Sequence, residues 1–346
     1  MRALQAVEFG LGPDGARLRE VAEPIPAADE VLIKVAAVSA SHLDLSVLSG
    51  RMAGVQPPRT LGIDPAGTVV ALGSEVDPSL LGAAVVVKPN IFCGVCSFCR
   101  SGRESDCLTQ PILGVHLDGG AADLVAVPMR SAFRLPAGMP ATLAAATVHT
   151  VPVALHMLRL VLPPSGDFTG SSVLVTGAAG AVGSAAVQLV KALGGTAIGV
   201  VRGADRVAAV CEIGADHVLD AQDPDLAVRV RALTGGGADV VVETTGSPAV
   251  VGRSFDALGW TGRMITCTGS GAQVHVDLGE LYRNRRGLQG TAGSDAADVV
   301  RALAMVTAGQ VRPLISRTVP LADYAGGYAA FDDRRRSGRI VFSLDN

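Results

Sequence analysis

The sequence has little net charge, since 29 basic residues face 32 acidic ones and the formal charge is −3. A field of one sign that could hold DNA or RNA is therefore lacking, and we expect no nucleic-acid partner. Lysine is scarce and occurs only as Lys34, Lys88 and Lys191, which we attribute to the composition of the genome. With 49% apolar and 18% charged residues the chain is too apolar for disorder, and its 346 residues suit two domains.

The sequence also lacks a secretory signal and a convincing membrane span. Residues 1–8 contain neither a long apolar run nor a small-residue cleavage site. The longest weakly polar stretch, 143–162, contains His149, His156 and Arg159, which a membrane span rarely tolerates. We interpret it as a buried junction between domains, and we expect a soluble, cytoplasmic protein without a membrane partner.

Four of the six cysteines are crowded into one segment with the spacing C-x2-C-x2-C-x7-C: Cys93, Cys96, Cys99 and Cys107. Clustered cysteines in a long intracellular chain indicate a metal site before they indicate disulfides. Four thiolates suit tetrahedral zinc and leave no open position, so we predict one structural zinc per chain. An iron–sulfur cluster is the alternative, but its common run has a gap of three before the last cysteine followed by proline.

A second strong pattern is a strand, a glycine-rich turn, a helix and another strand. The apolar run 172–176 ends in the turn 177–183, a helical stretch follows over 184–193, and a second strand covers 196–201. This order is what a dinucleotide site requires, because glycines let backbone amides approach the pyrophosphate at a helix N-terminus. The predicted cofactor residues here are Thr176, Gly177, Ala178, Gly180, Ala181, Val182 and Gly183.

The end of the second strand bears on the choice of cofactor. NAD enzymes place a carboxylate there for the ribose 2′-hydroxyl. This chain has Arg202, with Arg206 four residues later, and both guanidiniums suit a 2′-phosphate. We predict NADP(H), while the alternative is that both arginines are solvated residues at the start of a helix.

The alternation of strands and helices continues to about residue 292, with further strands at 217–219, 238–243, 263–268 and 288–292. It predicts an α/β fold with a doubly wound parallel sheet of about six strands. Thr245 and Thr268 lie at the carboxyl ends of two of these strands, where a bound nicotinamide would lie. Short alternating strands before residue 150 predict an antiparallel β domain, to which a last strand at 339–343 is expected to return.

Five motifs in order make the chain resemble the medium-chain dehydrogenase/reductase superfamily over essentially its full length. They are residues 62–67 (Gly-Ile-Asp-Pro-Ala-Gly) in place of G-H-E-x-x-G, the four cysteines, the turn 176–183, and the segments 309–313 and 337–341. The resemblance implies a GroES-like catalytic domain over 1–149 and 294–346, with a zinc lobe at about 90–110. It also implies a Rossmann NADP-binding domain over 150–293, an active site in the cleft between the two, and a homodimer or homotetramer.

The departures from the family concern the catalytic zinc of its alcohol dehydrogenases. Ser41 stands at the first ligand position, Ile63 at the histidine position, and the third position falls near His149. Isoleucine cannot ligate and a serine hydroxyl is a poor zinc ligand, so we expect no catalytic zinc. The chain then resembles the quinone-oxidoreductase-like branch, although an unorthodox metal site from His42, Asp64 and His149 stays open.

Without a metal, reduction of a simple ketone loses its main oxyanion stabiliser, whereas a conjugated alkene spreads the charge into an enolate. We therefore predict an NADPH-dependent reductase of an enone, quinone or similar small molecule. Ser41 and His42 are the candidates for contacting the substrate oxygen, Asp64 for orienting His42 or a water, and His149 for donating the proton. Each also has a structural interpretation: a packing or capping histidine for His42 and His149, and a turn aspartate for Asp64.

Two other functions stay open at this point. The first is an NADP-dependent alcohol dehydrogenase or carbonyl reductase that uses a histidine as its acid. The second is a non-catalytic NADP-binding protein, because an intact nucleotide turn indicates binding and not hydride transfer.

Overall fold

The computed structural model describes residues 1–269, 273, 275–333 and 336–344. The chain divides into two compact units. The first contains Met1–His149, Asp295–Thr307 and Leu314–Asn346, and the second contains Thr150–Ser294 with Ala308–Pro313. The short segment 308–313, which the sequence assigned to the catalytic domain, packs with the second unit.

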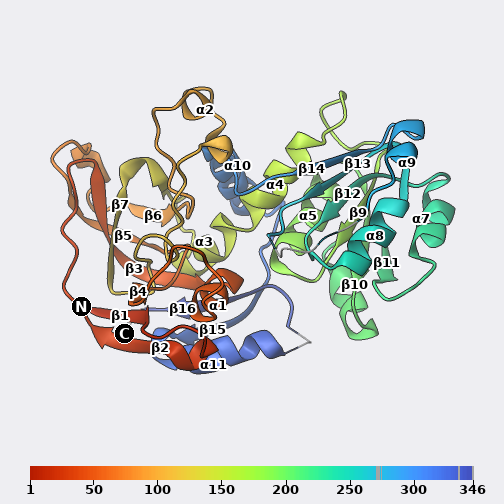
Figure 1. Ribbon diagram of the computed structural model, residues 1–346. Coiled ribbons are helices and arrows are strands. Elements are labelled where there is room, and N and C mark those ends of the chain that lie inside the picture. Colours follow the sequence, from red (N-terminus) through yellow and green to blue (C-terminus); the bar gives the residue numbers. More distant parts are fainter. Residues whose placement is uncertain (270–272, 274, 334–335, 345–346) are drawn as a thin grey trace. The chain divides into compact units, whose positions relative to one another are not determined.

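The first unit is built on a mostly antiparallel sheet of seven strands (Figure 1). Its strand order is β15-β16-β3-β5-β6-β8, with β7 paired to β3, and a smaller sheet has the order β2-β1-β4. The strands are β1 (Arg2–Ala6), β2 (Ala16–Glu20), β3 (Glu30–Ala40), β4 (Arg59–Thr60), β5 (Ala66–Leu72), β6 (Ala84–Val87), β7 (Leu124–Pro128), β8 (Ala132–Arg134), β15 (Ile315–Pro320) and β16 (Arg339–Ser343). The helices are α1 (His42–Leu48), α2 (Ser97–Arg100), α3 (Ala141–Val148), α10 (Ala296–Thr307) and α11 (Tyr324–Ala329).

Strand β3 is the centre of this unit. Its first half alternates buried Val31, Ile33 and Val35 with more exposed residues, which is the pattern of a strand with one face on a core. It pairs antiparallel with β5, β7 and β16, so it carries hydrogen bonds on both edges. The pairing with β16 confirms that the last strand of the chain returns to the first domain.

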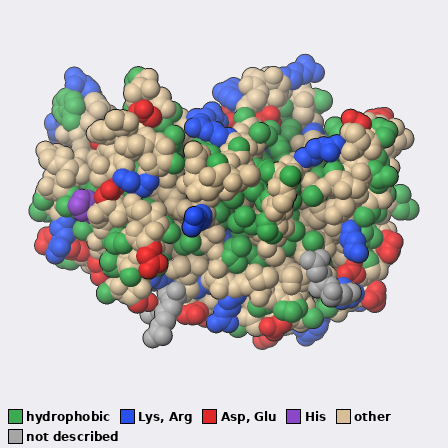
Figure 2. Space-filling view, turned by 180° about the vertical axis from the view of Figure 1, so that it is seen from behind, with side chains coloured by type: hydrophobic (Ala, Val, Ile, Leu, Met, Phe, Trp, Pro, Cys, Tyr) green, Lys and Arg blue, Asp and Glu red, His purple; other side chains and the backbone are tan. Residues whose placement is uncertain are grey.

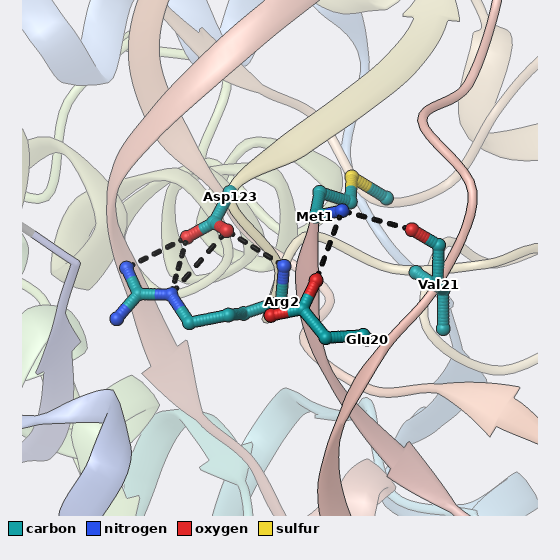
Figure 3. A network of polar contacts seen from close by, with 5 residues as sticks. All are labelled: Met1, Arg2, Glu20, Val21 and Asp123. Atoms are coloured by element: carbon teal, nitrogen blue, oxygen red, sulfur yellow. Dashed lines mark hydrogen bonds and ion pairs between the residues drawn. The ribbon is translucent and has the colours of Figure 1, made fainter.

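Polar contacts near the start of the chain fasten the smaller sheet (Figure 3). The amino group of Met1 donates to Val21 O at 2.9 Å and lies 3.3 Å from the Glu20 carboxylate. Arg2 donates from its backbone N–H to the carboxylate of Asp123 at 2.7 Å, and its guanidinium contacts the same carboxylate. These bonds tie β1 both to β2 and to the segment that leads into β7.

The second unit is a six-stranded sheet of order β11-β10-β9-β12-β13-β14, in which all five pairings are parallel. This is the doubly wound order in which the chain begins in the middle of the sheet and winds outward in both directions. It confirms the predicted parallel α/β domain. The strands are β9 (Ser172–Thr176), β10 (Thr196–Val201), β11 (His217–Asp220), β12 (Ala238–Glu243), β13 (Leu258–Thr266) and β14 (Gly287–Gly290). The helices are α4 (Val151–Leu160), α5 (Ala181–Ala192), α6 (Val207–Glu212), α7 (Leu226–Thr234), α8 (Pro248–Asp256) and α9 (Leu278–Arg283).

The sequence located β13 imperfectly. We predicted a strand from residue 263, but β13 already begins at Leu258. The sequence signal is interrupted because Gly259 and Gly262 lack apolar side chains. A Cβ at Gly262 would lie 2.8 Å from Ala238 O, so close approach of β12 requires glycine there.

The apolar stretch Ala141–Leu160 is long and apolar enough to cross a membrane by composition alone. In the structure it forms two helices, α3 and α4, which separate at His149 and Thr150. Since 78% of the stretch is buried, it has the character of core helices. On the face drawn in Figure 2, basic and acidic side chains are interspersed, as the small net charge predicts.

The turn after β9 gives a direct test of packing in the second unit. A Cβ at Gly183, in the first turn of α5, would lie 2.2 Å from Gly177 O, whereas a Cβ at Gly252 in α8 meets nothing within 4 Å. We expect Gly183→Ala to lower the unfolding midpoint and to weaken nucleotide binding at least about 10-fold, because the turn must open. Gly252→Ala should leave binding unchanged and stabilise the protein by up to about 1 kcal/mol. Urea unfolding and fluorescence titration with NADPH measure both, and equal behaviour of the two variants would contradict this account of the turn.

Candidate active site

The four clustered cysteines converge in the first unit. Their Sγ atoms all lie within 4.8 Å of one another, and those of Cys93 and Cys99 are 3.8 Å apart. Tetrahedral zinc with Zn–S bonds of about 2.3 Å places its sulfurs about 3.8 Å apart. Cys99 and Cys107 are buried, while Cys93 and Cys96 are partly exposed. The residues present therefore fit a zinc ion, and all four positions around it would be filled by sulfur.

Backbone N–H groups stabilise the thiolate form of this cluster. Val95 and Cys96 donate to the Cys93 sulfur at 3.5 and 3.4 Å, and Cys99 donates to the Cys96 sulfur at 3.5 Å. These donors lower the pKa of Cys93 to about 6. Burial, in contrast, raises the pKa of the Cys99 thiol to about 12. The backbone donors thus favour the thiolate, the form that binds zinc, at Cys93 in particular.

In the second unit the glycine-rich turn has the geometry of a nucleotide site. Gly177 has φ +60°, and a Cβ added at this position would lie 2.7 Å from the Thr244 hydroxyl. Gly180 is the N-cap of α5 without a capping side chain, so the first N–H groups of the helix are left for a ligand. The predicted residues Thr176 to Gly183 lie together here, at the carboxyl end of β9.

Glu243, which our reading of the sequence missed, organises the neighbouring strand ends. It is fully buried at the end of β12 and accepts hydrogen bonds from the backbone N–H groups of Thr245 and Gly246 at 2.7 and 3.0 Å. The hydroxyls of Thr245 and Thr268, which we predicted to contact the cofactor, donate to it at 2.6 and 3.3 Å. Glu243 therefore positions the loops that carry these two threonines.

A pocket of about 420 Å³ lies beyond the turn, at the end of β10. Three arginines line it: Arg202 and Arg206, which we predicted to pair with a 2′-phosphate, and Arg253 from α8. Arg253 donates to Ala221 O at 2.6 Å, and the other described lining residues include no Asp or Glu. The pocket suits a group with negative charge.

Ser41 and Asp44 form the start of helix α1. The Ser41 hydroxyl accepts from Leu43 N at 3.1 Å, and the Asp44 carboxylate accepts from Ser41 N at 2.8 Å, which completes a capping box. Asp44 also accepts from Gly62 N at 3.2 Å and is buried. Its burial raises its pKa to about 7. Both residues thus stabilise the start of α1, and Asp44 also fixes this helix to the segment that begins at Gly62.

Asp64 is fully buried and forms an ion pair with Arg339 of β16. Its other oxygen accepts from Ser39 N at 2.9 Å. Burial raises the pKa of Asp64 to about 6, although the guanidinium opposes that shift. The arrangement is that of a structural aspartate which ties β3 to β16, and any role for it in orienting His42 stays a prediction.

The three places where the family's alcohol dehydrogenases hold zinc have different chemistry here. Ile63 is fully buried in the core of the first unit, and Ser41 is engaged in the cap. Only His149, at the C-cap of α3, offers a good ligand. A single imidazole, with isoleucine and a capping serine at the two other ligand positions, does not fit a catalytic zinc ion.

His42 and His149 are both surrounded by positively charged side chains. Burial lowers the pKa of His149 to about 3, with further contributions from the charges of Arg339 and Lys88. The pKa of His42 is lowered by burial of its ring and by Arg336, Arg339 and Arg51, and its ring contacts Phe331 edge-to-face with centroids 4.9 Å apart. Neutral imidazoles can donate hydrogen bonds, but they are poorly suited to act as acids at neutral pH.

The sequence carried signals for some of the functional residues that we missed. Arg339 belongs to a motif we used for the family resemblance, but only its contact with Asp64 reveals its role. Lys88 is one of three lysines and follows a buried valine strand. Glu243 had no such signal, because a strand that ends in glutamate is common.

The Glu243 network can be tested with two substitutions. Glu243→Leu leaves two backbone N–H groups and several hydroxyls without an acceptor, so we expect nicotinamide cofactor affinity to fall at least about 10-fold. Glu243→Gln keeps one oxygen for the backbone donors, so its loss should be clearly smaller. Isothermal titration with NADPH measures both, and similar losses would show that the charge of Glu243 matters more than its acceptor role.

Asp44 predicts a dependence of stability on pH. Its pKa is near 3.8 when unfolded and about 7 when folded. The folded state therefore holds the extra proton, and this contribution is present below pH 4 and is lost as pH rises to about 7. We expect the urea midpoint of the unmodified protein to fall relative to that of Asp44→Asn between pH 5 and 8. Asp64 is present in both proteins, so a pH-independent difference would contradict the shift assigned to Asp44.

Comparisons with known proteins agree with this arrangement. Residues 27–137 match the family described as alcohol dehydrogenase GroES-like domain, and residues 181–308 match the family described as zinc-binding dehydrogenase. A NAD-dependent alcohol dehydrogenase of Saccharolobus solfataricus is 32% identical over 99% of both chains. An acryloyl-coenzyme A reductase of Sulfurisphaera tokodaii is 28% identical over 95% of this chain and 97% of its own.

Solved structures give the same result. A zinc-binding dehydrogenase of Sinorhizobium meliloti 1021 bound to NADP matches with a TM-score of 0.85 and 28% identity, over 99% of this chain and 98% of that one. These matches confirm the predicted GroES-like and Rossmann domains. The chain therefore belongs to the medium-chain dehydrogenase/reductase superfamily and is an oxidoreductase of that family.

Proposed function

We propose that the protein is an NADPH-dependent reductase of an activated carbon–carbon double bond, such as that of an enone or a quinone, and that it works without a catalytic zinc. The observation that carries the proposal is the burial of Ile63 at a ligand position, together with the use of Ser41 as a helix cap. An acryloyl-coenzyme A reductase among the relatives is named for reduction of such a bond.

The chemistry needs little more than position and hydrogen bonds. A nicotinamide held at the turn after β9 would supply a hydride to the β-carbon of the alkene, and the negative charge would then be spread to the carbonyl oxygen. The Ser41 hydroxyl accepts from Leu43 N, and its own proton has no acceptor among the described residues, so it can donate to that oxygen. A neutral His149 can donate a second hydrogen bond, and we assign the final proton to water.

The preference for NADPH rests on the pocket lined by three arginines. A 2′-phosphate carries negative charge that Arg202 and Arg206 would pair with, and the described lining offers no carboxylate for a free ribose 2′-hydroxyl. A relative was crystallised with NADP, whereas another is named NAD-dependent, so this choice needs its own test.

Measurement of NADPH and NADH affinity provides that test. We expect the Arg202→Ala/Arg206→Ala double variant to lose NADPH affinity at least about 10-fold and NADH affinity much less, because only NADPH carries the 2′-phosphate. Arg229→Ala is the control, since Arg229 is an exposed arginine of the same unit outside the pocket. Equal losses for both cofactors, or a preference of the unmodified protein for NADH, would contradict the assignment.

The reaction itself is tested by zinc content together with cofactor oxidation on a panel of enones, quinones and simple ketones. We expect one zinc per chain, turnover of the conjugated substrates, and at least about 100-fold slower turnover of the ketones, because no metal ion polarises the carbonyl. Two zinc ions per chain with ketone turnover would instead establish an alcohol dehydrogenase. Cofactor binding without any turnover would establish a non-catalytic nucleotide-binding protein.

We also propose a cytoplasmic homodimer or homotetramer. Strand β14 ends the parallel sheet and, among the described strands, pairs with β13 alone, and Leu288 on it is 43% exposed. Pairing of this edge with a second copy would cover both the backbone groups and the leucine. Sedimentation equilibrium should give at least twice the chain mass, and Leu288→Lys should shift the population towards the monomer. A monomeric unmodified protein would overturn this proposal.

A further inference from the structure

Lys88 is a buried cation that the proposed reaction does not use. It follows β6, is only 1% exposed, and donates from Nζ to Asn90 O at 3.0 Å. No carboxylate of the described residues lies within ion-pair distance of it. An ammonium without a close partner is expensive to bury, so its surroundings must supply negative charge in another way.

The surroundings of Lys88 are those of the four-cysteine cluster. Its Nζ lies 5.3 Å from the centroid of the Phe92 ring, and Phe92 packs in one buried cluster with Cys99 and Cys107. The negative groups that act on the ammonium are Glu104, Asp295, Cys99 and Cys107. They keep the pKa of Lys88 at about 8, above the value to which burial alone would lower it.

The two carboxylates are already engaged with other groups. Glu104 accepts from Ala296 N at 3.1 Å, and Asp295 accepts from Ser105 N at 2.8 Å. These bonds connect the lobe between Cys99 and Cys107 to the start of α10. Glu104 and Asp295 keep their charge in these bonds and act on Lys88 more strongly than the two cysteines do. The sulfur cluster is nevertheless the neighbour whose charge changes when zinc binds, because four thiolates around Zn²⁺ carry a net charge of −2.

We propose that the ammonium of Lys88 is the positive charge that balances the negative zinc–thiolate centre. Lys88 is then a positioning residue: across the ring of Phe92 its charge stabilises the thiolates and helps the lobe to retain zinc. Its bond to Asn90 O also fixes the segment 89–92 that leads into Cys93, so charge and backbone position act together. Without the ammonium the negative charge of the bound thiolates is no longer balanced, so zinc should dissociate from the lobe faster.

The test compares zinc release from the holoprotein in three variants. Lys88→Met keeps the length of the side chain and removes the charge, and Lys88→Arg keeps the charge. Lys34→Met removes an exposed lysine of β3 in the same unit and is the matched control. Release is followed with a chromophoric zinc chelator in excess, and circular dichroism establishes that each variant is folded.

We expect Lys88→Met to release zinc at least about 10-fold faster than the unmodified protein, as for other outer-shell partners of metal ligands. The rate of zinc release from Lys88→Arg should be closer to that of the unmodified protein, and the rate from Lys34→Met should equal it. With Co²⁺ in the lobe, the sulfur-to-cobalt charge-transfer band of Lys88→Met should shift to lower energy, since thiolates without a nearby cation are easier to oxidise.

Two results would overturn the proposal. One is unchanged zinc release and an unchanged cobalt band in Lys88→Met, with a lowered unfolding midpoint, because Lys88 would then serve packing and the two carboxylates alone. The other is equally fast release from Lys88→Met and Lys88→Arg, which would show that the shape of lysine and not its charge holds the lobe.

Discussion

The buried ion pair between Asp64 and Arg339 is the interaction on which the fold of the first unit depends. It joins β16 to the segment after Ile63, and through Ser39 N it also joins β3. Substitution of one partner would leave the other as an uncompensated buried charge. The protein should therefore tolerate a substitution of one residue only when the other is substituted as well. Burial is the main reason why the pKa values of His42 and His149 are low, and the charge of Arg339 lowers both further.

Two metal positions that the family can use have diverged in this chain. The lobe at 93–107 has four converging sulfurs, backbone donors to them and a buried lysine close by. The other position has an aliphatic side chain, a capping serine and one histidine. A protein can lose the second without the first because the lobe stabilises folding, whereas the second site contributes only to the reaction.

Individual residues show how far sequence reasoning reached. The four clustered cysteines converge as their spacing predicts, and the glycine turn lies between β9 and α5, because both depend on short-range geometry. The binding of a dinucleotide at the turn stays a prediction. Ser41 and Asp64 were chosen by their motif positions, and the structure places both in hydrogen bonds that stabilise the fold. Their roles in catalysis stay predictions. Arg253 was missed because its partner Ala221 lies 32 positions away along the chain. Glu243 was missed because a strand that ends in glutamate is common, and only its burial shows that it accepts from the loop that follows.

The sequence by itself determined the family, the two types of sheet, the cluster of four cysteines and the glycine-rich turn after β9, since each is encoded in a local pattern of residue types. Only the tertiary structure decided which polar groups are buried and what they contact. It placed Arg339 beside Asp64 across 275 positions of sequence, and Lys88 over the ring of Phe92. The physical reason is that desolvation and charge pairing depend on neighbours in space, and these set the protonation of a side chain.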